Sequence, residues 1–154
     1  MVAAFFILGA GFLIIEYLIK NNKIKLVQSI NRLNYKTAII IGLAQSLAVV
    51  PGVSRAGIVI FTMMILGFKR DDSARYSFLL AVPTILAAAG YDFYKSKDLL
   101  VISSNNLVLL VIGFIVSFIS AYIVVNWFIK YLQKNTLNIF AIYRIILAGI
   151  LLFV

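Results

Sequence analysis

The stretch VVPGVSRAG, from Val49 to Gly57, places a Pro-Gly break and a Ser-Arg pair inside a long apolar segment. A buried arginine costs about 2.5–3.5 kcal/mol even on the most lenient membrane-insertion scale, so such residues usually mark a pathway or a site. Pro51 ends a helix, and Gly52 can take the positive φ of a tight reversal. Ser54 is a good N-cap for a helix that starts after it. The stretch therefore predicts a polar turn between two helices.

The chain around this turn is apolar enough to require lipid as its solvent. Of its 154 residues, 64% are hydrophobic and 12% are charged, whereas soluble domains average about half and about a quarter. The runs from Val2 to Ile19 and from Leu107 to Ile129 match the roughly 20 apolar residues of a membrane-spanning helix. We therefore expect a multi-pass membrane protein.

Charge and missing residue types exclude several functions. The net charge of +9 comes largely from basic residues at the ends of apolar runs, which is a topology signal and gives no reason to expect a nucleic-acid partner. Cysteine and histidine are absent, which excludes disulfides, thiolate metal sites and phosphohistidine chemistry. Because histidine is absent, the chain cannot belong to the class of lipid phosphatases that use histidine as nucleophile and acid. We expect no metal ligands in this chain.

Residues 37–68 decide the topology. Split at Pro51-Gly52, this apolar block gives two helices of roughly 21–24 Å, each too short to cross a bilayer. Basic loops, which face the cytoplasm in membrane proteins, flank the block on both sides. We therefore predict a re-entrant helical hairpin over residues 37–68, which enters the membrane, turns at Pro51-Gly52 and returns to the same side.

The other apolar blocks then cross the membrane in alternation. They cover residues 74–94, 107–129 and 137–154, with a polar link over residues 95–106. Together with the first run they predict an all-α integral membrane fold of about four transmembrane helices and one re-entrant hairpin, in a single domain over residues 1–154. The expected cytoplasmic basic residues are Lys20, Lys23, Lys25, Arg32, Lys36, Lys69, Arg70, Arg75, Lys130 and Lys134, against Lys95 and Lys97 outside.

The hairpin tip has the chemistry of an anion site. The free N–H groups of the returning helix, its dipole and the Arg55 guanidinium would converge there, and a guanidinium suits phosphate. The competing interpretation is a simple kink whose arginine snorkels to the surface. Arg144 is a second intramembrane cation, which either completes the anion pocket or snorkels. Glu16 lies one turn from Lys20, and we expect it to snorkel at the inner interface.

The same residues carry a resemblance to a known family. PGVSRAG resembles the PGxSRSG signature of the undecaprenyl-diphosphate phosphatases of the bacitracin-resistance type. AQSLAVVPGVSRAG, YSFLLAVPTILAAAGYDFYKS and FAIYRIILAG resemble the second half of that family in order and spacing. The resemblance covers nearly the whole chain and implies the second half of an inverted-repeat architecture.

The resemblance implies a location in the bacterial cytoplasmic membrane and hydrolysis of undecaprenyl diphosphate in that bilayer, which recycles the carrier lipid of cell-wall synthesis. It places Ser54 and Arg55 in the catalytic pocket, with Arg55 gripping the diphosphate and Ser54 as either nucleophile or hydrogen-bonding group. Gly52 and Gly57 match turn positions that would contact substrate, and Gln45 matches a polar residue facing the pocket. A divalent cation, Mg²⁺ or Ca²⁺, is implied by the family, with its ligands outside this chain.

Two departures from the family pattern bear on activity. Ala56 stands where the family has a second serine, so one hydroxyl is missing. The acidic E-x-x-x-E segment of the family's first repeat has no counterpart, because Gln45 and Val49 stand at that spacing. We therefore expect a fragment or truncated version of a longer protein, which needs its missing N-terminal half or a homo-oligomer to complete the site and is inactive without one of them.

Two interpretations other than an enzyme remain open from the residues. Broken helices with a midplane anion site are also used by transporters, so the chain can be read as a non-catalytic lipid-phosphate carrier or transporter half. It can also be read as an inactive remnant that binds membranes or a partner.

Overall fold

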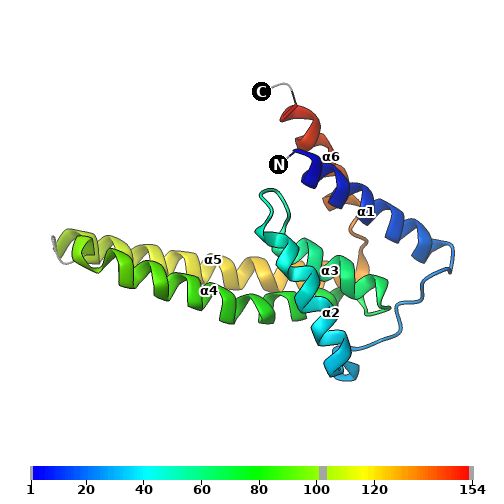
Figure 1. The fold of residues 1–154 in the computed structure, drawn as a ribbon, viewed down its shortest axis with the longest axis horizontal. Coiled ribbons are helices and arrows are strands. Elements are labelled where there is room, and N and C mark those ends of the chain that lie inside the picture. The colour runs from blue at the N-terminus through cyan, green and yellow to red at the C-terminus, as the bar shows by residue number, and fades with distance from the viewer. Residues whose placement is uncertain (1, 101–103, 153–154) are drawn as a thin grey trace.

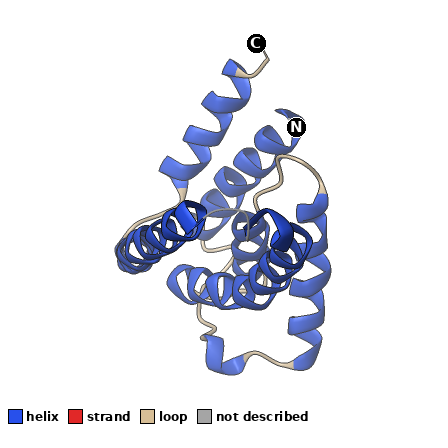
Figure 2. Ribbon diagram, turned by 90° about the vertical axis from the view of Figure 1, so that its left-hand side faces the viewer, coloured by secondary structure: helices blue, strands red, loops and turns tan. Residues whose placement is uncertain are grey.

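A computed structural model describes residues 2–100 and 104–152, and every regular element in these ranges is a helix (Figure 2). In chain order they are α1 (Val2–Lys20), the 3-10 turn η1 (Ile30–Arg32), α2 (Tyr35–Ser46), the 3-10 turn η2 (Leu47–Val49), α3 (Arg55–Ile65), α4 (Arg70–Leu100), α5 (Ser104–Lys134) and α6 (Asn138–Ile150). Three of the helices, α1, α4 and α5, are long and apolar enough to cross a membrane. The all-α membrane class predicted from composition is confirmed.

The helices form two groups. The pair α4 and α5 runs antiparallel and extends far from the rest of the chain, whereas α1 and α6 lie side by side at the other end (Figure 1). A Cβ atom added at Gly9 of α1 would lie 2.9 Å from Ile145 Cγ1 and 3.1 Å from the Ala141 carbonyl oxygen. The absence of a side chain at Gly9 therefore lets α1 and α6 approach closely. The hairpin of α2 and α3 lies between the two groups (Figure 1).

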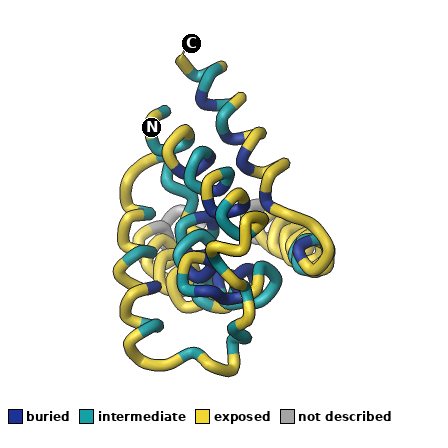
Figure 3. Tube along the Cα trace, turned by 90° about the vertical axis from the view of Figure 1, so that its right-hand side faces the viewer, coloured by how far each residue is buried: buried dark blue, intermediate teal, exposed yellow. Residues whose placement is uncertain are grey.

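Two buried apolar clusters hold the hairpin in place. Between α2 and α3, the buried side chains are Ile41, Val59, Met63 and Phe68. The second cluster joins α1 to a different face of α3, through Ile60 and Met64, and to the segment around the start of α6. Figure 3 colours all buried positions of the chain dark blue. Within the second cluster, the Phe12 ring packs edge-on against Phe61 with centroids 5.7 Å apart. Helix α3 is thus fixed on two sides.

The two basic loops beside the α2–α3 hairpin are in contact. The Gln28 backbone N–H donates to the Gly67 carbonyl at 3.0 Å, and the Lys69 N–H donates to the Gln28 carbonyl at 3.0 Å. The Gln28 side chain also donates to the Leu66 carbonyl at 3.0 Å. The loop before α2 and the loop after α3 therefore lie against each other.

Glu16 does not snorkel, and that prediction was wrong. Its side chain is only 4% exposed. Oε1 accepts hydrogen bonds from Arg70 Nε at 2.8 Å and from the Leu137 N–H at 3.0 Å, while Oε2 pairs with Arg70 Nη2. The carboxylate joins the start of α4 and the start of α6 to α1. The sequence suggested Lys20 as its neighbour because Lys20 is one turn away, whereas the real partner is 54 residues distant.

The prediction that residues 95–106 form a polar link between two helices was also wrong. Helix α4 continues to Leu100 and α5 begins at Ser104, while residues 101–103 lie outside the described residues. Polar side chains mark where a helix leaves lipid, but they do not by themselves end it. At the other end of the chain, α6 has 13 residues, short of a full span, and the predicted end of that block at residues 153–154 is not described.

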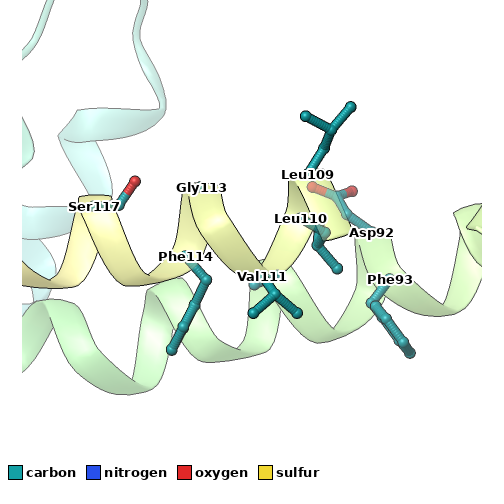
Figure 4. A pocket seen from close by; sticks show the side chains of 9 residues that line it. Asp92, Phe93, Leu109, Leu110, Val111, Gly113, Phe114 and Ser117 are labelled. Carbon is teal, nitrogen blue, oxygen red and sulfur yellow. The ribbon is translucent and has the colours of Figure 1, made fainter. Parts of the chain in front are cut away.

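Most positions of the α4–α5 pair are exposed (Figure 3), and many of them carry large apolar side chains. A groove of about 930 Å³ lies along these two helices, and its lining residues, drawn as sticks in Figure 4, are Ala89, Asp92, Phe93, Leu109, Leu110, Val111, Gly113, Phe114 and Ser117. Asp92 is the one carboxylate in this lining. Surface of this composition suits lipid chains or the apolar face of another membrane segment.

Candidate functional site

The hairpin tip has the local structure that its sequence predicted. Gly52 takes the left-handed conformation with φ +95°, which glycine adopts without strain. Ser54 is the N-cap of α3, and its Oγ accepts a hydrogen bond from the Gly57 N–H at 3.1 Å. In an α-helix the first N–H groups, here those of Arg55 and Ala56, have no acceptor within the helix. The turn and the cap are confirmed.

Arg55 projects from the first turn of α3 toward α4. Its Nη1 donates to Thr84 Oγ1 at 2.9 Å, and the Thr84 hydroxyl donates to the Ala81 carbonyl at 2.9 Å. Thr84 directly follows Pro83, which interrupts the backbone hydrogen bonding of α4 because proline has no N–H. The guanidinium is thereby directed by a fixed hydroxyl, and its other N–H groups stay available.

Arg55 and Gln45 line the same cavity. This cavity has a volume of about 380 Å³, and its lining residues are Gly42, Gln45, Ser46, Ala48, Val49, Arg55 and Thr84. Gln45 Oε1 is buried and has no hydrogen-bond partner among the described residues. A buried polar atom without a partner is unusual in native proteins and calls for an explanation. The amide oxygen is suited to accept a hydrogen bond from a ligand hydroxyl or a bound water.

Ser54 and Gly57 border a second cavity of about 240 Å³. Its other lining residues are Phe12, Ala56, Ile60, Phe78, Val124, Val125, Phe128, Leu137 and Phe140. This lining is almost wholly apolar, so the cavity suits hydrocarbon better than phosphate. Gly57 is packed closely, since an added Cβ would lie 2.9 Å from Leu8 Cδ2 and 3.0 Å from Ser54 Cβ. The structure thus places Ser54 and Arg55 next to each other at the helix start but beside different cavities.

Arg144 reaches the tip from α6. Its side chain is buried, with 5% exposed, and Nη2 donates to the Gly52 carbonyl oxygen at 3.0 Å. The guanidinium carbon lies 4.6 Å from the centroid of the Phe5 ring. Arg144 therefore does not snorkel to the surface. It does not line either of the two cavities described at the tip.

The side chains around the Arg55 cavity do not fit a divalent cation. Mg²⁺ and Ca²⁺ require oxygen ligands that include carboxylates, whereas this lining offers a guanidinium, an amide and hydroxyls. No group of three or more His, Cys, Asp or Glu residues that could hold a metal ion occurs among the described residues. The buried carboxylate Glu16 is occupied by Arg70.

Thr84 is the site residue that sequence reasoning missed. It lies 29 residues after Arg55, and no pattern in the sequence pairs the two. A hydroxyl directly after a proline, within an apolar run, was the available signal. Its partner could be assigned only once α3 and α4 were placed against each other.

Taken together, the fold and the tip define a class: a helical membrane protein in which a broken helix presents an arginine and an unpartnered amide oxygen to one cavity. Comparison with known sequences makes this more specific. Residues 1–150 match the model of the family described as bacitracin resistance protein BacA, and the chain belongs to that family.

Several curated relatives carry the name undecaprenyl-diphosphatase. The chain is 45% identical over 145 residues to the protein of Wolinella succinogenes, covering 94% of this chain and 56% of the relative. It is 43% identical over 139 residues to that of Campylobacter jejuni, covering 90% and 51%. With the protein of Sulfurimonas denitrificans the identity is 41% over 154 residues, covering 99% and 59%. The chain spans about half the length of the curated relatives it matches.

Proposed function

We propose that this chain is the phosphate-binding part of an undecaprenyl-diphosphate phosphatase, a membrane hydrolase that recycles a cell-wall carrier lipid. The observation that carries the proposal is the placement of Arg55 at the N-terminus of α3, held by Thr84 and sharing a cavity with the unpartnered oxygen of Gln45. A helix N-terminus and a guanidinium both favour a phosphate group. The family membership supports the same ligand.

In this proposal α2 and α3 form the re-entrant hairpin over residues 37–68, while α1, α4, α5 and the apolar block over residues 137–154, of which α6 covers 13 residues, provide the four spans of the cytoplasmic membrane. Helices α2 and α3 have 12 and 11 residues, and at 1.5 Å per residue each extends only about 17–18 Å. The loop before α2 and the loop after α3 meet at Gln28. With both loops at the membrane surface, the tip of so short a hairpin would lie within the bilayer. Irregular backbone at that depth must be buried in protein or line a wet cavity.

The residues of this chain would act on the diphosphate by binding and charge neutralisation. Arg55 and the free N–H groups of α3 would hold the phosphate oxygens, where charge accumulates as the anhydride bond breaks. The Ser54 hydroxyl accepts from the Gly57 N–H and keeps its own proton to donate. The isoprenoid tail would lie along the apolar side chains beside Ser54 and along the exposed faces of α4 and α5.

The chain itself offers no base and no fitting metal ligands at the tip. The divalent cation implied by the family would therefore have to be held by carboxylates from a segment outside this chain or from a second copy. The exposed apolar faces of α4 and α5 are consistent with such a partner. In this proposal, the chain binds the phosphate, and hydrolysis requires the assembly that also contains the cation-binding segment or second copy.

The test is phosphate release from undecaprenyl diphosphate in lipid nanodiscs, for the full-length protein and for variants in this region. We expect Arg55→Ala to lose nearly all release, while Arg32→Ala, which removes an exposed arginine from the loop before α2, retains it. Tight binding with no release by any version would favour a non-catalytic carrier. Absence of both binding and release would contradict the enzyme and the carrier alike.

A further inference from the structure

Arg144 is the most deeply buried basic residue at the tip, and its contacts are with the protein itself. Its guanidinium lies over the Phe5 ring of α1, and Nη2 donates to the carbonyl oxygen of Gly52. It is absent from the lining of the Arg55 cavity. These contacts point to a role in holding the tip and give no direct contact to a ligand bound beside Arg55.

The bonded carbonyl belongs to the residue on which the turn depends. Gly52 has φ +95°, and its peptide group leads directly to Val53 and to the cap residue Ser54. Carbonyl groups of a turn have no helical partner, and in lipid or protein interior they need one. The arginine supplies it from α6, a helix 92 residues away in the sequence.

The position of Arg144 is itself fixed by close packing. Near it, the missing side chain at Gly9 lets α1 contact Ala141 and Ile145 of α6, and the Arg144 Cβ lies 3.4 Å from the place a Gly9 Cβ would occupy. Phe5 lies one turn earlier on α1 and covers the guanidinium. The α1–α6 pair therefore forms a rigid base from which one side chain extends to the turn.

We propose that Arg144 is a positioning residue: by hydrogen bonding to the Gly52 carbonyl, it fixes the turn that sets the start of α3 and hence the place of Arg55. Misplacing a binding group by about 1 Å can lower a rate by about 100-fold, so a mobile turn would impair Arg55 without altering it. The expected loss of turnover rests on the proposed phosphatase function. The expected loosening of the turn does not, because it concerns the protein without any ligand.

The mobility of the turn can be measured with a spin label, because the chain has no cysteine and a single introduced cysteine is a unique labelling site. A nitroxide label at Val49→Cys reports on the tip, where Val49 is 86% exposed, and a label at Ile39→Cys reports on the body of α2. Both labels are measured by electron paramagnetic resonance in nanodiscs without substrate. The test variant is Arg144→Met, which keeps an unbranched stem against Phe5 and removes the hydrogen bond.

We expect Arg144→Met to make the label at position 49 distinctly more mobile and to leave the label at position 39 unchanged. Arg144→Lys, which retains a donor and the charge, should restore most of the immobilisation. Ile146→Met, an equivalent change at an exposed position of the same helix, should alter neither label. Unchanged mobility at position 49 in Arg144→Met overturns the proposal, as does a general loosening seen equally at position 39.

The turnover number, kcat, is the second measurement. For the full-length protein we expect kcat to fall about 10- to 100-fold in Arg144→Met and to recover to within about threefold of wild type in Arg144→Lys. If the tip loosens but the unmodified protein releases no phosphate, the positioning role stands and the phosphatase function fails. If the tip stays fixed while turnover collapses, Arg144 acts on substrate and the positioning role fails.

Discussion

The buried carboxylate Glu16 gives the sharpest prediction about stability. It pairs bidentately with Arg70 and accepts a third hydrogen bond from the Leu137 N–H, so one side chain connects α1 to the starts of α4 and α6. In Glu16→Gln the charge is lost while the shape is kept. Arg70 is then left with no carboxylate partner in a partly buried position.

The expected magnitude follows from the burial of the two partners. Removing one member of a buried ion pair costs about 3–5 kcal/mol because the other charge stays uncompensated. The Arg70 side chain is 21% exposed and can turn partly toward water, which favours the lower end of that range. We therefore expect Glu16→Gln to lower the free energy of unfolding by about 3 kcal/mol.

The assay is equilibrium unfolding by SDS in mixed micelles, followed by circular dichroism and by the fluorescence of the single tryptophan, Trp127. Asp71→Asn is the matched control, since it removes a carboxylate next to Arg70 that only interacts with the helix start, worth about 0.3–1 kcal/mol. The double variant Glu16→Leu, Arg70→Met should recover much of the loss, because apolar replacement of a buried pair is often neutral. Equal losses in Glu16→Gln and Asp71→Asn would refute the role of the pair.

Two further substitutions test the packing of the tip. Thr84→Val removes the hydroxyl that holds Arg55, and it should weaken binding of a diphosphate ligand about tenfold, because a hydrogen bond to a charged group is worth at least about 1.5 kcal/mol. Thr62→Val, whose hydroxyl bonds only within α3, is the control, and equal affinities in both variants would argue against the contact. Gly57→Ala should lower the free energy of unfolding by about 1–3 kcal/mol, because its methyl group meets an α1 side chain at 2.9 Å. Gly90→Ala, which meets nothing within 4 Å, should lose no stability, and a neutral Gly57→Ala would contradict the close packing.

The sequence was sufficient where the determining features are local. Pro51, Gly52 and Ser54 specify the turn and the cap within four residues, so their conformation follows from backbone sterics and hydrogen bonding alone. The contact between the two basic loops is what a hairpin returning to its own side would give, while the re-entry of that hairpin into a membrane stays a prediction. Apolar composition was likewise enough to identify the membrane class.

The contacts that place functional groups were not predictable in the same way. Arg55 and Thr84, Glu16 and Arg70, and Arg144 and Gly52 are pairs formed between helices distant in the sequence. Any of these polar side chains has several chemically suitable partners along the chain, and only the packing of the helices selects one. This is why Glu16 was assigned to the interface near Lys20, although in the structure it is buried against Arg70.

Ligand affinity measures whether Arg55 binds the diphosphate. Farnesyl diphosphate, a shorter lipid diphosphate, can be titrated against this chain in nanodiscs by calorimetry, with Arg55→Ala and the exposed control Arg32→Ala. A charge-assisted hydrogen bond contributes about 1.5–3 kcal/mol, so we expect a 10- to 150-fold loss of affinity in Arg55→Ala and little change in Arg32→Ala. Equal affinity in the unmodified chain and in Arg55→Ala would contradict the account.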